Sequence, residues 1–130
     1  MFLDTSGLYS LFDHRNAYHS AASRFFDEDH RLLTHNYVLS EFIALANARH
    51  LHRRNAQLFI MDIMDNPLVE IFWVGESHHR SAIDFLARRL DKDYSLCDAV
   101  SFMQMTSNGE HEALTTDRHF EQEGFVRLLK

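Results

Sequence analysis

The sequence opens with Met1-Phe2-Leu3, followed at once by Asp4-Thr5-Ser6-Gly7. A short apolar run that stops at polar residues is typical of a buried strand, and a threonine or serine beyond it can cap the next helix. The order of these residues predicts a strand at the very N-terminus, with a carboxylate at its carboxyl end. The patterns further along the chain decide what kind of sheet this strand joins.

Helical and extended patterns alternate through the rest of the chain. Helices are expected where apolar residues recur at helical spacing, and strands where β-branched or apolar residues form short runs. We expect helices over residues 16–29, 36–52, 55–64, 78–90 and 97–106, a helical turn at 119–120, and strands over 31–34, 69–74, 113–115 and 124–126. Strands that alternate with helices form a mostly parallel sheet covered on both faces, so the predicted fold class is α/β.

The composition of the 130 residues is that of an ordinary globular protein, with 45% hydrophobic and 25% charged residues. We expect a single domain over residues 1–130. The lone cysteine, Cys97, excludes an internal disulfide and a cysteine-rich metal site, and favours a reducing, cytoplasmic compartment. Because the sequence has neither a signal-peptide pattern nor an apolar run of about 20 residues, we expect no association with a membrane.

The net charge of −6 taken alone argues against a nucleic-acid partner, because such proteins usually carry a basic face. Divalent cations held by converging carboxylates would offset most of this charge. Arginine accounts for 11 of the 13 basic residues, and its planar guanidinium suits phosphate oxygens as well as surface ion pairs. The charge balance therefore does not exclude a phosphate-containing substrate.

Four acidic residues occupy positions from which their side chains could meet. Asp4 directly follows one predicted strand and Asp117 lies just beyond another, whereas Glu41 and Asp98 lie near the starts of predicted helices. The carboxyl ends of neighbouring parallel strands share one edge of a sheet, where such folds bind ligands. Converging carboxylates repel one another unless a cation compensates them, and oxygen ligands favour Mg²⁺ or Mn²⁺. Taken singly, each residue could instead be an ordinary turn former or helix cap.

The same four acids stand within ordered motifs. Asp4-Thr5-Ser6, Ser40-Glu41, Ser95-Leu96-Cys97-Asp98-Ala99 and Thr115-Thr116-Asp117-Arg118-His119-Phe120 resemble the motifs of PIN-domain ribonucleases, and most closely those of the VapC-type toxins of bacterial toxin–antitoxin pairs. The resemblance runs in order over essentially the whole chain. Cys97 stands where threonine is common in that family, while the four acidic positions follow the family pattern.

This resemblance implies a PIN-like three-layer α/β/α sandwich with a central, mainly parallel sheet. It implies a Mg²⁺- or Mn²⁺-dependent endoribonuclease that acts on RNA, with a cognate antitoxin protein as partner and a homodimer as its assembly. The implied metal-binding and catalytic residues are Asp4, Glu41, Asp98 and Asp117, with Thr5, Ser6 and Thr115 orienting them from beside. Arg118, next to Asp117, is a candidate contact to the phosphates of the substrate.

Other functions and other surfaces stay open on the sequence. A non-catalytic PIN-fold interaction module is one alternative, although the intact set of four acids argues against it. An aspartate-dependent phosphatase is another, but Ser6 stands where its second aspartate is expected. The histidines show no metal-binding spacing such as His-Glu-x-x-His, and His119 could approach substrate or pack beside Phe120. Exposed apolar residues of the segment 38–64, two helices expected to form a hairpin, could dock a partner or simply belong to the core.

Overall fold

The computed structural model describes all 130 residues. Its strands are β1 (Phe2–Leu3), β2 (Leu32–His35), β3 (Val69–Phe72), β4 (Glu112–Leu114) and β5 (Val126–Arg127). Its helices are α1 (Thr5–Phe12), α2 (His19–Glu28), α3 (Asn36–Ala48), α4 (Arg53–Asp65), α5 (Glu76–Ala87), α6 (Leu96–Ser107) and α7 (Arg118–Gln122). Every expected strand and helix is present, with ends shifted by a few residues, and α1 is an additional helix.

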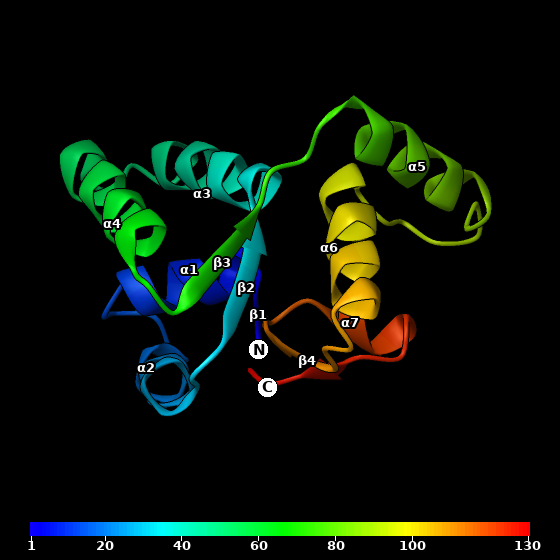
Figure 1. Cartoon of the computed structure of the whole chain (residues 1–130). Helices are drawn as coiled ribbons and strands as arrows, with labels where there is room; N and C mark the ends of the chain where they lie inside the picture. The colour runs from blue at the N-terminus through cyan, green and yellow to red at the C-terminus, as the bar shows by residue number, and fades with distance from the viewer.

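The strands form one sheet that separates two groups of helices. Helices α1 to α4 lie on one side and α5 to α7 on the other (Figure 1). The strand order is β3-β2-β1-β4-β5, and each neighbouring pair is parallel. The predicted α/β class and the three-layer sandwich are confirmed, and the sheet is parallel throughout. Because β1 is the central strand, its carboxyl end lies between those of β2 and β4.

Phenylalanine side chains fill much of the core. Phe2, Phe42, Phe102 and Phe120 are fully buried, and each such burial contributes roughly 1.5–3 kcal/mol to stability. The rings of Phe102 and Phe120 meet edge to face with their centroids 5.0 Å apart, which ties α6 to α7. No helix combines the length and the apolar composition that a membrane crossing requires.

Helix α1 differs from the sequence prediction, which has no helix before residue 16. It forms directly after β1 with Asp4 at its N-cap. Gly7 faces β4 so closely that a Cβ atom there would lie 2.0 Å from the carbonyl oxygen of Leu114. A helix of eight residues is marginal on its own propensity. Packing against the sheet therefore stabilises α1, and the helix expected from residue 16 begins only at His19.

His35 is a fully buried polar residue between β2 and α3. Its Nδ1 accepts a hydrogen bond of 3.3 Å from the backbone N–H of Val38, and its Nε2 lies 2.9 Å from Ser101 Oγ. The Ser101 hydroxyl donates its own hydrogen to the carbonyl of Cys97. The imidazole is therefore neutral, with its hydrogen on Nε2. Burial lowers the pKa of His35 to about 3.

Acid is expected to destabilise the fold through His35. In the unfolded chain this imidazole takes up a proton near pH 6.5, whereas in the folded chain it does so only near a pKa of about 3. Stability therefore rises with pH between these two values, and the His35 contribution falls by about 2 kcal/mol from pH 7 to pH 5. Urea denaturation of the wild type and of His35→Asn at both pH values measures this loss, since asparagine keeps an N-cap acceptor without titrating. The same loss in both proteins would contradict the prediction.

Candidate active site

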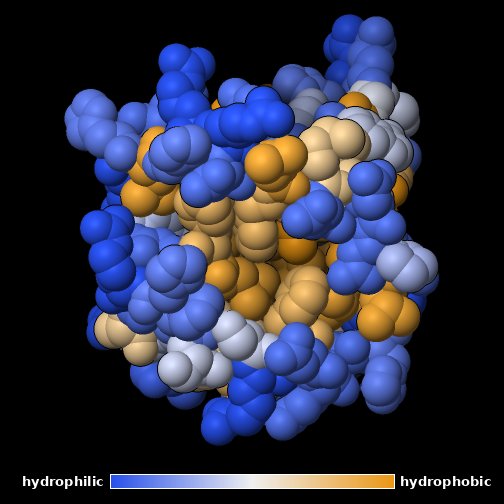
Figure 2. Space-filling view, turned by 90° about the vertical axis from the view of Figure 1, so that its left-hand side faces the viewer, coloured by the Kyte–Doolittle hydropathy of each residue, from blue (hydrophilic) through white to orange (hydrophobic).

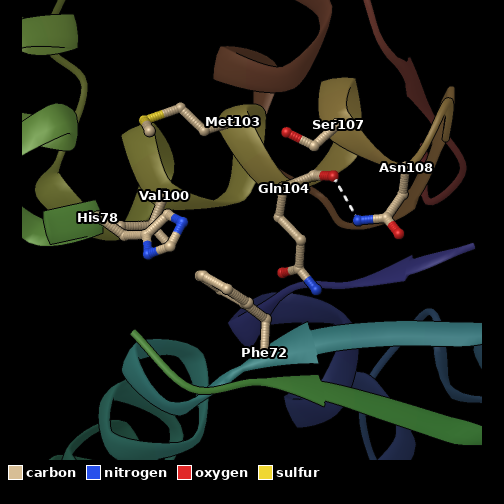
Figure 3. Close-up of a pocket in the computed structure, with 7 residues that line it drawn as sticks. All are labelled: Phe72, His78, Val100, Met103, Gln104, Ser107 and Asn108. Atoms are coloured by element: carbon tan, nitrogen blue, oxygen red, sulfur yellow. Dashed lines mark hydrogen bonds between the residues drawn. The ribbon is translucent and has the colours of Figure 1, made fainter. Parts of the chain in front are cut away.

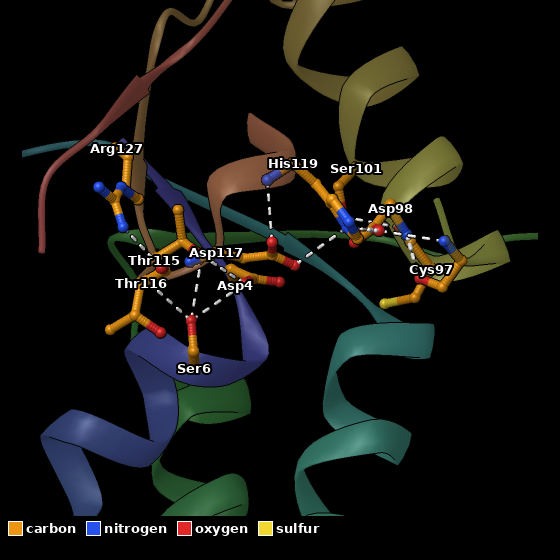
Figure 4. Close-up of polar contacts among 11 residues, drawn as sticks. Asp4, Ser6, Cys97, Asp98, Ser101, Thr115, Thr116, Asp117, His119 and Arg127 are labelled. Carbon is orange, nitrogen blue, oxygen red and sulfur yellow. Dashed lines mark hydrogen bonds and ion pairs between the residues drawn. The ribbon is translucent and has the colours of Figure 1, made fainter. Parts of the chain in front are cut away.

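Asp4 lies at the carboxyl end of the central strand β1, and only 6% of it is exposed. The pairing of β1 with β4 sets Leu3 opposite Leu114, which places Thr115 beside Asp4. The Thr115 hydroxyl donates a hydrogen bond of 2.7 Å to Asp4 Oδ2, and the Ser6 hydroxyl lies 3.2 Å from the same oxygen (Figure 4). The register of the sheet and two hydroxyl groups therefore fix the orientation of this carboxylate.

Ser6 and Thr115 also join the first turn of α1 to the loop that follows β4. Their hydroxyl oxygens lie 3.0 Å apart. The backbone N–H of Thr116 donates to Ser6 Oγ, and that of Asp117 donates to Thr115 Oγ1. Ser6 and Thr115 thus lie within hydrogen-bonding distance of Asp4 and of each other. The Thr5 hydroxyl is buried and has no hydrogen-bond partner within the chain, and Thr5 acts on the Asp4 carboxylate through its backbone.

Asp98 approaches the site from the first turn of α6. Its Oδ2 accepts the backbone N–H of Ser95 at 3.0 Å, while its own N–H donates to Ser95 Oγ, which together form a capping box. His119 Nδ1 lies 2.9 Å from the same Oδ2 and 3.4 Å from Oδ2 of Asp117. Burial raises the pKa of Asp98, the charge of Asp117 adds to the increase, and the hydrogen bonds from Ser95 and His119 oppose it.

His119 therefore lies beside Asp98 and Asp117, and these three residues form the acidic cluster. The sequence leaves this role of His119 undecided. Its backbone N–H caps α7 by donating to Asp117 Oδ1 at 2.9 Å. One ligand atom from each of Asp98, Asp117 and His119 lies within 4.8 Å of the other two. The imidazole also packs against the ring of Tyr94, with the centroids 5.3 Å apart. Its position two residues beyond Asp117 is the only signal of this role in the sequence.

The charges of Asp98 and Glu41 act on Asp4. Burial raises the pKa of Asp4 to about 7, both of these charges add to the increase, and the hydrogen bond from Thr115 opposes it. Glu41 is exposed on α3, so it borders the cluster from the solvent side. Burial likewise raises the pKa of the Cys97 thiol, with Glu41 and Asp4 adding to it. A buried, protonated thiol is a poor nucleophile, so Cys97 is not a candidate for nucleophilic catalysis.

The donor atoms gathered here suit a hard divalent cation. Carboxylate oxygens of Asp98 and Asp117 lie beside an imidazole nitrogen of His119. Asp4 lies close enough for the charge of Asp98 to raise its pKa. Mg²⁺ and Mn²⁺ prefer such oxygen-rich sites. The buried Thr5 hydroxyl beside Asp4 has no hydrogen-bond partner within the chain. The acidic cluster could therefore hold a metal ion.

Two arginines lie beside the cluster. Arg118 is the first residue of α7, directly after Asp117, and it is exposed and forms no ion pair. Arg49, which the sequence does not single out, lines a pocket together with Ser6 and Thr116. No local pattern could have identified Arg49, because only the packing of α3 beside α1 brings it to this place.

A separate pocket of about 150 Å³ lies between β3, α5 and α6 (Figure 3). Phe72 and Met103 supply apolar walls, and Gln104 adds an amide. Gln104 donates from Nε2 to the carbonyl of Thr34, whereas its buried Oε1 has no partner. None of the predicted site residues lines this pocket, so it is distinct from the acidic cluster.

Comparisons with known proteins agree with this geometry. Residues 1–125 match the PIN domain family. The chain is 31% identical over 129 residues to the 23S rRNA-specific endonuclease VapC20 of two Mycobacterium tuberculosis strains, CDC 1551 / Oshkosh and ATCC 25618 / H37Rv, covering 98% of this chain and 97% of the relative. The crystal structure of Mycobacterium tuberculosis VapC20, a sarcin–ricin loop cleaving toxin, matches at a TM-score of 0.87 with 29% identity, covering 99% of this chain and 98% of that chain.

The resemblance drawn from the sequence motifs is thereby confirmed. The matching family covers all four acidic positions, and the matching structure has the same fold over nearly the full length. The chain belongs to the PIN-domain family, among its VapC-type toxins.

Proposed function

We propose that this chain is a Mg²⁺- or Mn²⁺-dependent endoribonuclease, the toxin of a toxin–antitoxin pair, built as one PIN domain over residues 1–130. The observation that carries the proposal is the cluster of Asp98, Asp117 and His119, whose ligand atoms lie within 4.8 Å of one another. Asp4 lies at the carboxyl end of the central strand, and its pKa is raised by burial and by the charges of Asp98 and Glu41. A divalent cation that also binds phosphate oxygens would relieve this repulsion.

The proposed metal-binding residues are Asp4, Glu41, Asp98 and Asp117. When bound, a divalent cation lowers the pKa of water and neutralises the charge that develops on phosphate oxygens during in-line attack. The carboxylates would hold the ion, and one of them would accept the proton of the attacking water. Hydrogen bonds to Asp4 and Asp98 orient these carboxylates before substrate arrives, which reduces the reorganisation that the reaction requires.

Neighbouring side chains would keep the carboxylates in place. Thr115 and Ser6 hold one oxygen of Asp4, and His119 holds one oxygen of Asp98. Such partners set the direction of the ligand lone pairs and are typically worth 10–100-fold in metal affinity or activity. Arg118, exposed and unpaired beside the cluster, would contact a phosphate of the RNA.

Cleavage of RNA in the presence and absence of metal tests the proposal. We take ribosomal RNA as the first substrate, because the relative is named a 23S rRNA-specific endonuclease. Purified protein is incubated with total RNA in Mg²⁺, in Mn²⁺ or in excess chelator, and new ends are mapped by primer extension. We expect cuts with either ion and none with chelator. Cleavage that persists in chelator would contradict the metal dependence.

A small phosphomonoester serves as the control substrate for the alternatives. A phosphatase would release phosphate from p-nitrophenyl phosphate and leave RNA intact, whereas a non-catalytic interaction module would act on neither substrate. Either result would overturn the nuclease proposal. Release of phosphate is not expected, because Ser6 stands at the position of the second aspartate that phosphatase chemistry would require.

The proposed antitoxin partner would dock on the side of the molecule formed by α1 to α4. Figure 2 shows a hollow with apolar atoms on this side. On α4, Leu58 and Met61 are 48% and 51% exposed, more than a core position allows. A small DNA-binding reading frame directly upstream, whose product inhibits the cleavage, would support this partner. An upstream product that leaves cleavage unchanged would oppose it.

We further propose that the chain works in the cytoplasm as a homodimer. The free thiol of Cys97 fits a reducing compartment. Trp73 is 61% exposed and Leu90 is 87% exposed, so apolar surface is available for a second copy. Sedimentation at the mass of a single 15.3 kDa chain would contradict the dimer.

A further inference from the structure

A pocket of about 180 Å³ adjoins the acidic cluster on the side of α1, α2 and α3. Ser6 and Thr116 line it, and the same two residues are hydrogen-bonded to each other within the network that holds Asp4. Tyr9, Tyr18 and Arg49 are among the six other residues that line it. A ligand whose phosphate reaches the carboxylates could therefore extend directly into this pocket.

Arg49 supplies a positive charge that no acidic group neutralises. It forms no ion pair, in contrast to other arginines such as Arg31 and Arg89. Its guanidinium lies over the ring of Tyr9, 4.9 Å from the centroid. The Tyr9 hydroxyl is itself anchored by a hydrogen bond of 3.2 Å to Asp13. The aromatic ring thus supports one face of the guanidinium and leaves the group available to a ligand.

The stretch of chain around Arg49 is basic, although the chain as a whole is acidic. No aspartate or glutamate occurs in residues 42–61, which include Arg49, Arg53 and Arg54. Arg53 and Arg54 lie exposed in the first turn of α4 and form no ion pairs. A nucleic-acid strand that leaves the pocket in this direction meets positive charge, as backbone binding requires.

The side chains that line the pocket match a nucleotide. Bases stack on tyrosine rings and on guanidinium planes, at about 1–3 kcal/mol for each base. The side-chain oxygen of Asn16, which also lines the pocket, accepts the backbone N–H of Tyr18. The amide NH₂ of Asn16 is left to donate to the edge of a base.

We propose that this pocket is a nucleotide subsite, in which Arg49 contacts the RNA nucleotide next to the phosphodiester that is cut. The proposal rests on RNA cleavage at the acidic cluster. It adds a contact that fixes the position of the RNA strand relative to that cluster. Arg49 does not touch the carboxylates, so it acts on substrate binding rather than on the chemical step.

Binding and cleavage by Arg49→Gln test this assignment. In an Asp98→Asn background, fluorescence anisotropy measures the affinity for a labelled single-stranded RNA oligonucleotide of mixed sequence at several salt concentrations. We expect Arg49→Gln to weaken binding about tenfold and to reduce the slope of log affinity against log salt by about 1. In the active protein, the same change should raise KM about tenfold and leave kcat within about twofold.

Two further variants sharpen the result. Arg88→Gln removes an exposed, unpaired arginine at the C-cap of α5, and it should change neither affinity nor salt slope. Arg49→Lys keeps the charge and loses the planar group, so it should restore the salt slope but only part of the affinity. An Arg49→Gln protein that folds normally and binds RNA as tightly as its parent would overturn the proposed subsite and leave the nuclease proposal unaffected. A wild-type protein that cuts no RNA would instead overturn the nuclease, and the binding measurement would still decide the subsite.

Discussion

Asp98→Asn is expected to abolish RNA cleavage and to leave the fold intact. The substitution removes one negative charge from the cluster without changing the shape of the side chain. Loss of a partner that only orients a metal ligand already costs 10–100-fold, so loss of a charged ligand should lower the cleavage rate about 1,000-fold or more. The asparagine oxygen can still accept the hydrogen bonds that Ser95 and His119 direct at Asp98 Oδ2.

In the metal-free protein, Asp98→Asn is not expected to lower the melting temperature, although the same substitution should abolish cleavage when metal is present. Burial raises the pKa of Asp98, so its charge is unfavourable in the fold, and the neutral asparagine is expected to melt at the same temperature or higher. Added Mg²⁺ should raise the melting temperature of the wild type, since it binds only the folded state, and should do so less in the variant. Asp62→Asn, an exposed position on α4, is the control for loss of one charge. Full activity in a folded Asp98→Asn protein would rule out the proposed metal site.

The carboxylates could be predicted from the sequence because strand ends are local signals. Asp4 and Asp117 each follow an apolar run closely, and a parallel sheet collects the ends of neighbouring strands at one edge. The register of β1 with β4 then brings Asp4 beside Thr115 without any further condition. The position of Asp98 could be predicted in the same way, since Ser95 and Asp98 stand at the spacing of a capping box.

Contacts between distant segments could not be predicted in this way. His119 meets Asp98 only because α6 and α7 pack together, and Arg49 meets Ser6 across a pocket only because α3 lies beside α1. Helix α1 escaped prediction for a related reason, since Ser6, Gly7 and Ser10 weaken its helical pattern. Two of these residues make contacts outside the helix instead. The Ser6 hydroxyl hydrogen-bonds to Asp4, and Gly7 permits the close approach of α1 to β4.

Gly7→Ala is expected to destabilise the fold by about 3 kcal/mol or more, because the added methyl group has no room. Its carbon would lie 2.0 Å from the carbonyl oxygen of Leu114 and 2.8 Å from the carbonyl carbon. These are backbone atoms in the sheet, so no side-chain rotation can relieve the overlap, and α1 must move away from β4. We expect the melting temperature to fall by roughly 10 °C or more. Calorimetry of the metal-free protein measures the shift.

The sign of this effect separates tertiary packing from helix propensity. Alanine is a better helix former than glycine by about 1 kcal/mol, so propensity alone would make Gly7→Ala stabilising. Gly75→Ala is the matched control, since Gly75 has nothing within 4 Å of an added Cβ and a φ of −100° that alanine adopts freely. It should cost less than about 1 kcal/mol. Because movement of α1 would also draw Ser6 away from Thr115, whatever Gly7→Ala protein still folds should cut RNA more slowly. A stable and fully active Gly7→Ala protein would show that the close approach of α1 to β4 does not position the site.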